Sequence, residues 1–277
     1  MKKIKVTQLW TYPIKSLPGI SLQESPLLSK GLEYDRSWML VDESMHFISQ
    51  RHYPKMALIK ISIEDFGLKL TYKDMPALIV PWVNTELEQY ESVKVSVWKD
   101  ECQALHINTA IDNWFSEVLG VNCLLVYCPS ESKRLVDSDY AFHKEQTRFS
   151  DGFPLLLISE ESLEDLNQRL NSKGEKTLSM KNFRPNIVVN GCNAYAEDDW
   201  KSFTVSEVDF SVVKPCSRCV ITTVDPDTGV KAQSAEPLRT LMTYRKKGTQ
   251  AFFGQNLLFH YEEQKVLKLG DTLSLNK

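Results

Sequence analysis

The sequence predicts a mostly β protein with some helices, in the α+β class. Residues 93, 95 and 97 are valines that alternate with Lys94 and Ser96, which is the period-two pattern of a half-buried strand. Similar short runs recur along the chain, and turn-forming clusters such as Leu17-Pro18-Gly19 separate some of them. Several short strands at this spacing favour a barrel or a sandwich over a parallel sheet.

In the first half of the chain we predict strands wherever apolar residues alternate or run together: Ile4–Tyr12, Arg36–Val41, Ala57–Ile63, Leu68–Tyr72, Ala77–Val83 and Val93–Val97. A helix is predicted over Thr109–Leu119. Asn108 can cap its start, its apolar residues share one face, and Gly120 suits its exit.

The second half begins with the polar stretch Pro129–Gln146, which we interpret as an interdomain or active-site loop. Ser159 is the predicted N-cap of an amphipathic helix that Gly174 ends, and a short helix is predicted at Pro237–Arg245. The strands predicted here are Pro154–Ile158, Asn186–Val189, Phe203–Val213, Val220–Val224, Asn256–Tyr261 and Val266–Leu275.

Composition narrows the class of protein. With 277 residues the chain can form one large domain or two closely packed ones. A net charge of −3 argues against nucleic-acid binding, which usually needs a basic face. No apolar stretch approaches the roughly 18–20 residues that cross a bilayer. The basic start Met1–Lys5 lacks the apolar core of a signal peptide, so we expect a cytoplasmic protein.

Six cysteines in a chain of this size do not indicate a disulfide scaffold. They are Cys102, Cys123, Cys128, Cys192, Cys216 and Cys219. In a reducing compartment most such cysteines are buried thiols, and the exceptions are metal ligands or nucleophiles. The pair in Cys216-Ser217-Arg218-Cys219 is the candidate exception.

This CxxC pair has three interpretations. A thioredoxin-like motif opens a helix, but the β-branched run Val220–Val224 follows here. A structural zinc site needs four ligands, and the sequence has no second CxxC and no nearby histidine pair. The third interpretation is a single thiolate bound to a soft transition metal, with the other cysteine beside it. Spacing alone leaves the choice open.

The segment Lys214–Gly229, with Lys-Pro-Cys-Ser-Arg-Cys followed by Thr-Thr-Val-Asp-Pro-Asp-Thr-Gly, resembles the signature of the MOSC family, named for the C-terminal domain of molybdenum-cofactor sulfurase. It is most similar to the branch that contains the mitochondrial amidoxime reducing component and its bacterial relatives. The likeness covers nearly the whole chain. Further matching segments follow in the family's order: Tyr12–Ser16 with Gly19, Tyr34–Val41, Phe47–Arg51, Phe183–Val189, Phe253–Asn256 and Leu269–Asp271.

The resemblance implies a MOSC N-terminal β-barrel domain over residues 1–125, packed against a β-barrel MOSC domain over residues 126–277. It also implies the molybdenum cofactor, in which molybdenum is held by a molybdopterin. The second cysteine of the motif ligates molybdenum in such relatives, which carries over to Cys219; Cys216 is then a neighbour, expected to be a small buried residue.

The remaining site residues also follow from the resemblance. The matching family positions bind the anionic cofactor, and here they are Lys15, Ser16, Arg36, Arg184 and Asn186. Cations and hydroxyl donors suit this task because the pterin ends in a phosphate. Asp151 resembles an acid near the metal that relays protons, so Cys219 and Asp151 are the implied catalytic residues.

The implied function is an oxidoreductase that removes oxygen from N-hydroxylated small molecules. Compared with other family members, the chain shows no iron–sulfur cluster pattern, membrane anchor or pyridoxal-phosphate domain. We therefore expect electrons from a separate protein, such as a ferredoxin, a haem protein or a flavin reductase, and no sulfur mobilisation by this chain alone. The alternative is a non-catalytic carrier of the molybdenum cofactor or of sulfur.

Overall fold

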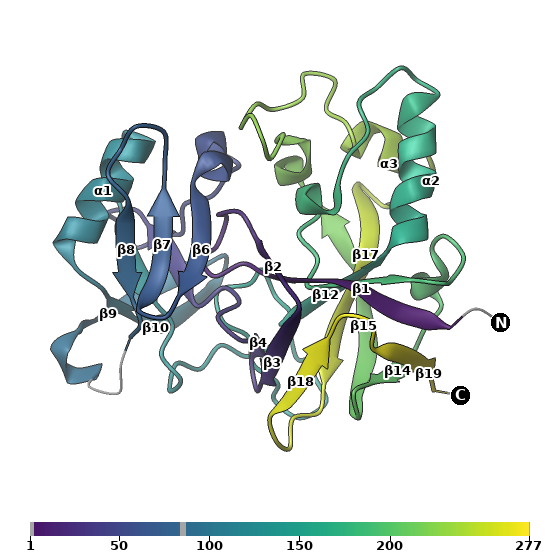
Figure 1. Cartoon of the computed structure of the whole chain (residues 1–277), viewed down its shortest axis with the longest axis horizontal. Coiled ribbons are helices and arrows are strands. Elements are labelled where there is room, and N and C mark those ends of the chain that lie inside the picture. The colour runs from purple at the N-terminus through teal and green to yellow at the C-terminus, as the bar shows by residue number, and fades with distance from the viewer. Residues whose placement is uncertain (1–2, 84–86, 277) are drawn as a thin grey trace.

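The structure is a computed structural model that describes residues 3–83 and 87–276. About 39% of the chain is strand, and three α-helices are present in the described part. Figure 1 shows two lobes side by side, with the helix labelled α1 at the outer edge of one lobe and α2 and α3 on the other. The predicted mostly β, α+β fold is confirmed.

The lobe that holds most of the second half is a closed barrel of seven strands. Its order is β12-β13-β1-β19-β14-β15-β17, and β17 pairs with β12 to close it. These strands are β1 (Ile4–Thr11), β12 (Leu155–Ser159), β13 (Ile187–Asn190), β14 (Ser202–Val205), β15 (Val208–Arg218), β17 (Gln250–Phe259) and β19 (Thr272–Leu275). Leu9, Leu157, Phe203, Phe210 and Leu257 are buried together in its core. Two short strands flank the barrel, β2 (Ile20–Leu22) and β16 (Lys246–Lys247).

The other lobe consists of two antiparallel sheets with an apolar core between them, and a second apolar cluster covers the opposite face of the first sheet. The first sheet has the order β5-β11-β10-β9 and the second β6-β7-β8. Their bounds are β5 (Trp38–Val41), β6 (Lys60–Glu64), β7 (Gly67–Thr71), β8 (Leu78–Pro81), β9 (Glu91–Val97), β10 (Asp100–His106) and β11 (Leu124–Tyr127). The side chains of Trp38, Leu68, Phe115 and Leu125 are fully buried between these sheets and α1.

Strands from the two ends of the sequence pair with each other. The first strand, β1, lies between β13 and β19 in the barrel, although most of the residues that follow it build the other lobe. Figure 1 shows β1 in the same lobe as β14, β15 and β17. A small sheet of β3 (Glu24–Leu28), β4 (Gly31–Leu32) and β18 (Lys265–Lys268) also joins the two ends of the chain. The segment after β1, which holds Lys15 and Ser16, is therefore fixed at the seam between lobes. The border predicted near residue 125 stays a prediction.

Both predicted amphipathic helices and their N-caps are confirmed, but the second helix ends at Asn171 with Ser172 as its C-cap, so the end predicted at Gly174 is wrong. In α1 (Thr109–Leu119), Asn108 Oδ1 accepts a hydrogen bond from the Ile111 amide at 2.9 Å, and Gly120 has the left-handed φ of 71°. In α2 (Glu160–Asn171), Ser159 Oγ accepts from the Ser162 amide. The third helix is α3 (Leu238–Tyr244), and the 3-10 helices are η1 (Pro54–Leu58), η2 (Leu87–Gln89), η3 (Met180–Asn182), η4 (Ala196–Asp198) and η5 (Val220–Thr223).

The strand predicted at Val220–Val224 is wrong, because Val220–Thr223 form the 3-10 helix η5. The threonine hydroxyls explain the difference. Thr222 Oγ1 donates to the Cys219 carbonyl and Thr223 Oγ1 to the Val220 carbonyl, each three residues back. Such bonds stabilise a tight turn despite the β-branched side chains.

Other strand predictions were right in place but wrong in extent. The first part of Ala57–Ile63 belongs to η1, where Pro54 stands at the start of the turn. Phe203–Val213 is split into β14 and β15 by Ser206 and Glu207, which both have positive φ and make the tight turn of a hairpin. Val266–Leu275 is likewise split into β18 and β19.

The polar stretch Pro129–Gln146 contains no regular helix or strand, as predicted for a loop. Its buried Arg134 donates to the backbone carbonyls of Arg148, Ser150 and Asp151. The loop therefore fixes the segment that carries Asp151. None of the helices in residues 3–83 and 87–276 is long and apolar enough to cross a membrane.

Candidate functional site

A cavity of about 130 Å³ opens at the seam between the two lobes. It is lined by all seven residues that the sequence assigns to the site, which are Lys15, Ser16, Arg36, Asp151, Arg184, Asn186 and Cys219. They come from five separate segments: the loop after β1, the turn before β5, the segment before β12, the segment before β13, and the end of β15. The structure brings together every residue that was predicted to form one site.

Cys219 is the N-cap residue of η5, directly after β15 ends at Arg218. The change from strand to tight turn at this point leaves its side chain partly exposed in the cavity. The guanidinium of Arg51, from the other lobe, places Nη2 3.3 Å from Cys219 Sγ. This contact fixes the position of the sulfur at the wall of the cavity.

Cys216 lines the same cavity, but it is only partly buried, so the expectation of a small buried residue is wrong. Its pKa is raised above the ordinary value, chiefly because the surrounding protein desolvates the thiolate. The side-chain contact of its sulfur is a weak one to the Ser217 carbonyl at 3.7 Å. Burial therefore disfavours the thiolate form of Cys216.

Arg218 carries an unsatisfied donor. Its Nε and Nη1 atoms donate to the carbonyls of Phe253 and Phe183, both at 2.8 Å. Its Nη2 atom is buried and has no hydrogen-bond partner among the described residues, although the side chain lines the cavity. A buried charged donor left unpaired is costly, so a site of this kind calls for an acceptor from a bound molecule.

Lys15 and Asp151 form an ion pair with Nζ and Oδ1 2.5 Å apart. Lys15 Nζ also donates to the Phe149 carbonyl, and its side chain is only 6% exposed. Burial lowers the pKa of Lys15 to about 8, against the opposing effect of Asp151. Partial desolvation opposes ionisation of Asp151, but Lys15, Arg51 and Trp98 outweigh it and hold the pKa of Asp151 well below its usual range. The proton of this pair therefore resides on Lys15.

Arg36 is held in place before any ligand binds. Its Nη1 atom contacts both carboxylate oxygens of the buried Asp35, at 2.6 and 2.7 Å, and the amide oxygen of Asn186 at 3.2 Å. Asn186 in turn donates to Asp35 and to the Trp10 carbonyl and accepts from the Leu156 amide. Both polar atoms of the Asn186 amide are thus engaged within the protein, and they orient Arg36.

Arg184, unlike Arg36, has no carboxylate partner among the described residues. The guanidinium groups of Arg184 and Arg36 each lie 4.3 Å from the ring of the buried Tyr12. Arg184 Nη1 donates to the Leu17 carbonyl, and no carboxylate among the described residues pairs with it. Burial, followed by repulsion from Arg36, lowers its pKa to about 10, so it remains a cation at neutral pH.

Three of the predicted residues have left-handed backbones. The φ angles are 67° for Ser16, 48° for Arg36 and 58° for Arg184. A residue other than glycine adopts this conformation at a cost of about 1–3 kcal/mol, and such residues cluster at functional sites. The surrounding contacts hold all three in place. The Ser16 hydroxyl has no hydrogen-bond partner among the described residues, so it is available to a ligand.

Sequence reasoning missed Arg51 and Arg218, which line the cavity, and Trp98, which does not line it but contacts the lining residues Asp151 and Arg51. Arg51 and Arg218 stand inside segments that carry the family resemblance, so a signal was present. Trp98 had none; its indole Nε1 donates to Asp151 Oδ1 at 3.1 Å from the other lobe. The described lining has five cationic side chains and one carboxylate, and this excess of positive charge suits an anionic ligand.

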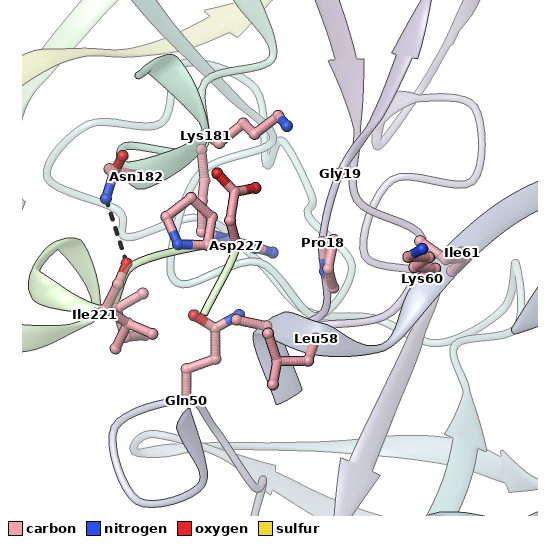
Figure 2. Close-up of a pocket in the computed structure, with 14 residues that line it drawn as sticks. Pro18, Gly19, Gln50, Leu58, Lys60, Ile61, Lys181, Asn182, Ile221 and Asp227 are labelled. Atoms are coloured by element: carbon pink, nitrogen blue, oxygen red, sulfur yellow. Dashed lines mark hydrogen bonds between the residues drawn. The ribbon is translucent and has the colours of Figure 1, made fainter. Parts of the chain in front are cut away.

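A second cavity of about 360 Å³ adjoins the first and shares Asn182, Arg184 and Ile221 with it. Figure 2 shows that its lining comes from both lobes, with Leu58, Lys60 and Ile61 facing Lys181, Asn182 and Asp227. Asn182 Nδ2 donates a hydrogen bond to the carbonyl of Val224 at 3.3 Å, and both residues line this second cavity. Together the two cavities offer a ligand a larger volume than the cavity lined by Cys219 alone.

Across residues 3–83 and 87–276, no group of three or more His, Cys, Asp or Glu side chains is placed to hold a metal ion. A zinc site built on Cys216 and Cys219 therefore lacks the further ligands that a tetrahedral centre requires. What the described residues place at the cavity is the Cys219 sulfur together with five cationic side chains.

Residues 3–122 match the family described as the MOSC N-terminal beta barrel domain, and residues 144–274 match the MOSC domain. Mitochondrial amidoxime-reducing component 1 of Mus musculus is 35% identical over 98% of this chain and 82% of its own length. The protein of the same name from Homo sapiens is 33% identical over the same shares. Molybdenum cofactor sulfurase of Oryza sativa subsp. japonica is 33% identical over 94% of this chain, which is 33% of that longer protein. With both domains in this order and relatives that match along nearly its full length, the chain belongs to the MOSC family, together with the mitochondrial amidoxime-reducing components.

Proposed function

We propose that this protein is a molybdenum-cofactor-dependent oxidoreductase that reduces N-hydroxylated small molecules. The observation that carries the proposal is the convergence of Cys219 and four cationic side chains from distant segments on one cavity. The names of the relatives support the same reading, since they include amidoxime-reducing components and a molybdenum cofactor sulfurase.

The residues present fit such a cofactor. Molybdenum is a soft metal that prefers sulfur, and Cys219 offers a sulfur ligand beside the guanidinium of Arg51. The buried Nη2 of Arg218 has no partner and needs an acceptor, as an anionic pterin phosphate or a pterin ring edge provides. Lys15, Ser16, Arg36 and Arg184 would hold the anionic cofactor, and Asn186 would keep Arg36 in position. When bound, the cofactor supplies the two-electron redox chemistry that the side chains cannot provide.

The side chains have a part in moving protons. Reduction of an amidoxime to an amidine breaks the N–O bond, consumes two electrons and two protons, and releases water. Lys15 carries the proton of the Lys15–Asp151 pair, and its pKa of about 8 lets it give that proton up near neutral pH. The ionised Asp151, 62% exposed, links this ammonium to solvent, from which the proton is replaced.

The electrons come from a separate protein in this proposal. The candidates are a ferredoxin, a haem protein and a flavin reductase, and the physiological compartment is proposed to be the cytoplasm. The substrate class is the amidoximes, hydroxylamines and N-hydroxylated bases, which share the N–O bond.

The proposal is tested with protein made in a molybdenum-proficient host. The purified protein should contain molybdenum and, with an artificial electron donor, convert benzamidoxime to benzamidine. Cys219→Ser should lose both the metal and the turnover. Cys192→Ser is the matched control, because Cys192 is partly buried beside Glu161 and does not line the cavity.

Two results would count against it. Molybdenum without turnover favours the alternative, a non-catalytic carrier of molybdenum cofactor or of sulfur, which the relationship to the sulfurase also supports. Zinc in place of molybdenum, lost in Cys219→Ser, would contradict both versions.

A further inference from the structure

Trp98 occupies an unusual position at the edge of the site. It lies at the tip of the hairpin formed by β9 and β10, its φ angle is 59°, and 49% of its surface is exposed. A bulky residue rarely adopts a left-handed backbone. Residues held in such conformations cluster at functional sites, so this tryptophan calls for an explanation.

Contacts tie the indole to the catalytic side of the cavity. Its Nε1 donates to Asp151 Oδ1 at 3.1 Å, and the guanidinium of Arg51 lies 4.5 Å from its ring. The same Arg51 is 3.3 Å from Cys219 Sγ. Trp98 is therefore separated from the proposed metal ligand by a single side chain, and it reaches there from the opposite lobe.

A second aromatic side chain supports the indole. The ring of Phe47 meets Trp98 edge-on, with centroids 4.9 Å apart, and the Nζ atom of Lys15 lies 5.0 Å from the Phe47 ring. The two cations that contact Asp151 thus each lie over one ring of this pair. These contacts hold the indole in one orientation, so little conformational freedom remains to be lost when a ligand packs on its exposed surface.

We propose that Trp98 is a specificity-determining residue: its exposed indole surface stacks on the planar aromatic part of an N-hydroxylated amidine whose N–O group is directed at Cys219. This inference rests on the proposed function and specifies the substrate class, namely aryl amidoximes in preference to small alkyl ones. Offset stacking on a fixed indole favours flat π-systems, whereas a methyl group gains little from it.

The test compares two substrates that share the amidoxime group, benzamidoxime and acetamidoxime, in the molybdenum-loaded protein. Trp98→Leu removes the aromatic ring, and Trp98→Phe keeps a ring but loses the N–H bond to Asp151. Phe66→Leu is the control, because Phe66 is an exposed aromatic residue, 59% exposed, in the turn between β6 and β7, and it does not line the cavity. KM and kcat are measured for both substrates, and binding of benzamidoxime is measured by calorimetry without an electron donor.

We expect Trp98→Leu to raise KM and the dissociation constant for benzamidoxime by roughly three- to tenfold, with KM for acetamidoxime changed less than about twofold. Trp98→Phe should retain most of the preference, and Phe66→Leu all of it. An equal loss on both substrates, or a Trp98→Phe variant as impaired as Trp98→Leu, means that Trp98 only anchors Asp151 and overturns the inference.

The outcomes also separate this inference from the proposed function. Turnover of both amidoximes without dependence on the ring at position 98 leaves the function standing and removes the stacking role. Binding of benzamidoxime that Trp98→Leu weakens, without any turnover, removes the function and leaves the stacking role standing. Neither binding nor turnover in the loaded protein overturns both.

Discussion

Arg51 Nη2 and Cys219 Sγ lie 3.3 Å apart, although the two residues are separated by 168 positions and come from different lobes. The contact joins the lobe built by β5 to β11 to the proposed metal ligand at the end of β15. The geometry of the thiol therefore depends on how the two lobes are packed. Substitutions on either side of the boundary between the lobes should therefore change the position of the Cys219 sulfur.

The first prediction concerns Arg51. Arg51→Leu removes a charge-assisted contact, a class worth about 1.5–3 kcal/mol, so benzamidoxime turnover should fall roughly 10- to 100-fold. Arg51→Lys keeps the charge but cannot present a planar group to both Trp98 and the sulfur, so it should rescue only part of the activity. Steady-state kinetics and molybdenum content are the measurements. Full activity in Arg51→Leu would show that the contact has no functional role.

The second prediction concerns pH. Lys15 must hold its proton to donate it, so activity should fall as the pH rises through its pKa of about 8. Asp151 raises that pKa, and Asp151→Asn removes this effect. The alkaline limb of the pH–rate profile should therefore move to lower pH in Asp151→Asn. In Lys15→Arg the alkaline limb of the pH–rate profile should be absent below pH 10, because a guanidinium does not titrate in that range. A limb at the same pH in all three proteins would rule Lys15 out as the proton donor.

The third prediction concerns Asp35, whose side chain is 2% exposed and pairs with Arg36. Asp35→Asn leaves the guanidinium of Arg36 without its counter-charge in a buried setting. Breaking a buried pair on one side costs about 3–5 kcal/mol, and this loss should appear in the free energy of unfolding from urea denaturation. Glu101→Gln is the control, since its pair with Lys94 is about 60% exposed and should contribute less than about 1 kcal/mol. Equal effects of the two substitutions would contradict the role assigned to Asp35.

The fourth prediction concerns the closure of the barrel at Gly254. A Cβ added there would lie 2.6 Å from Ile158 Cγ1 and 2.8 Å from the Leu157 carbonyl, on the adjoining strand β12. Its φ of 78° adds the strain of a left-handed alanine. Gly254→Ala should therefore destabilise the protein by roughly 2–5 kcal/mol, as the sum of overpacking and backbone strain.

Gly174→Ala isolates the backbone part of this cost. Gly174 has a similar φ of 73°, and a Cβ there meets nothing within 4 Å. Its substitution should cost only about 1–2 kcal/mol. Thermal unfolding of both variants gives the difference, and a Gly254→Ala protein no less stable than Gly174→Ala would show that β12 and β17 can move apart freely.

Local patterns were enough to predict the helices and most strands, because the caps at Asn108 and Ser159 and the alternation at 93–97 act within a few residues. They failed at Val220–Thr223, where hydroxyl-to-carbonyl bonds outweigh the strand preference of β-branched residues. They also could not show that β1 belongs to the barrel, since strand order depends on partners more than 150 residues away.

The candidate site was predicted through short matched segments rather than through chemistry read from single residues. Those segments include Lys15, Arg36 and Arg184, and the structure places all three at one cavity. What the segments could not show is pairing: Arg36 is bound to Asp35, whereas Arg184 has no carboxylate partner among the described residues. Trp98 was missed because its role depends on the packing of one lobe against the other.

The position of β1 has a consequence for biosynthesis. This strand is synthesised well before its barrel neighbour β19, and nearly all the other strands lie between them in the sequence. The barrel therefore stays open along that seam until β19 has been made, with the unpaired backbone edge of β1 available to other chains. Long-range pairings of this kind form slowly. Nascent chains should depend on a holdase chaperone until β19 pairs with β1, while the lobe with β5 to β11 is able to fold earlier during synthesis.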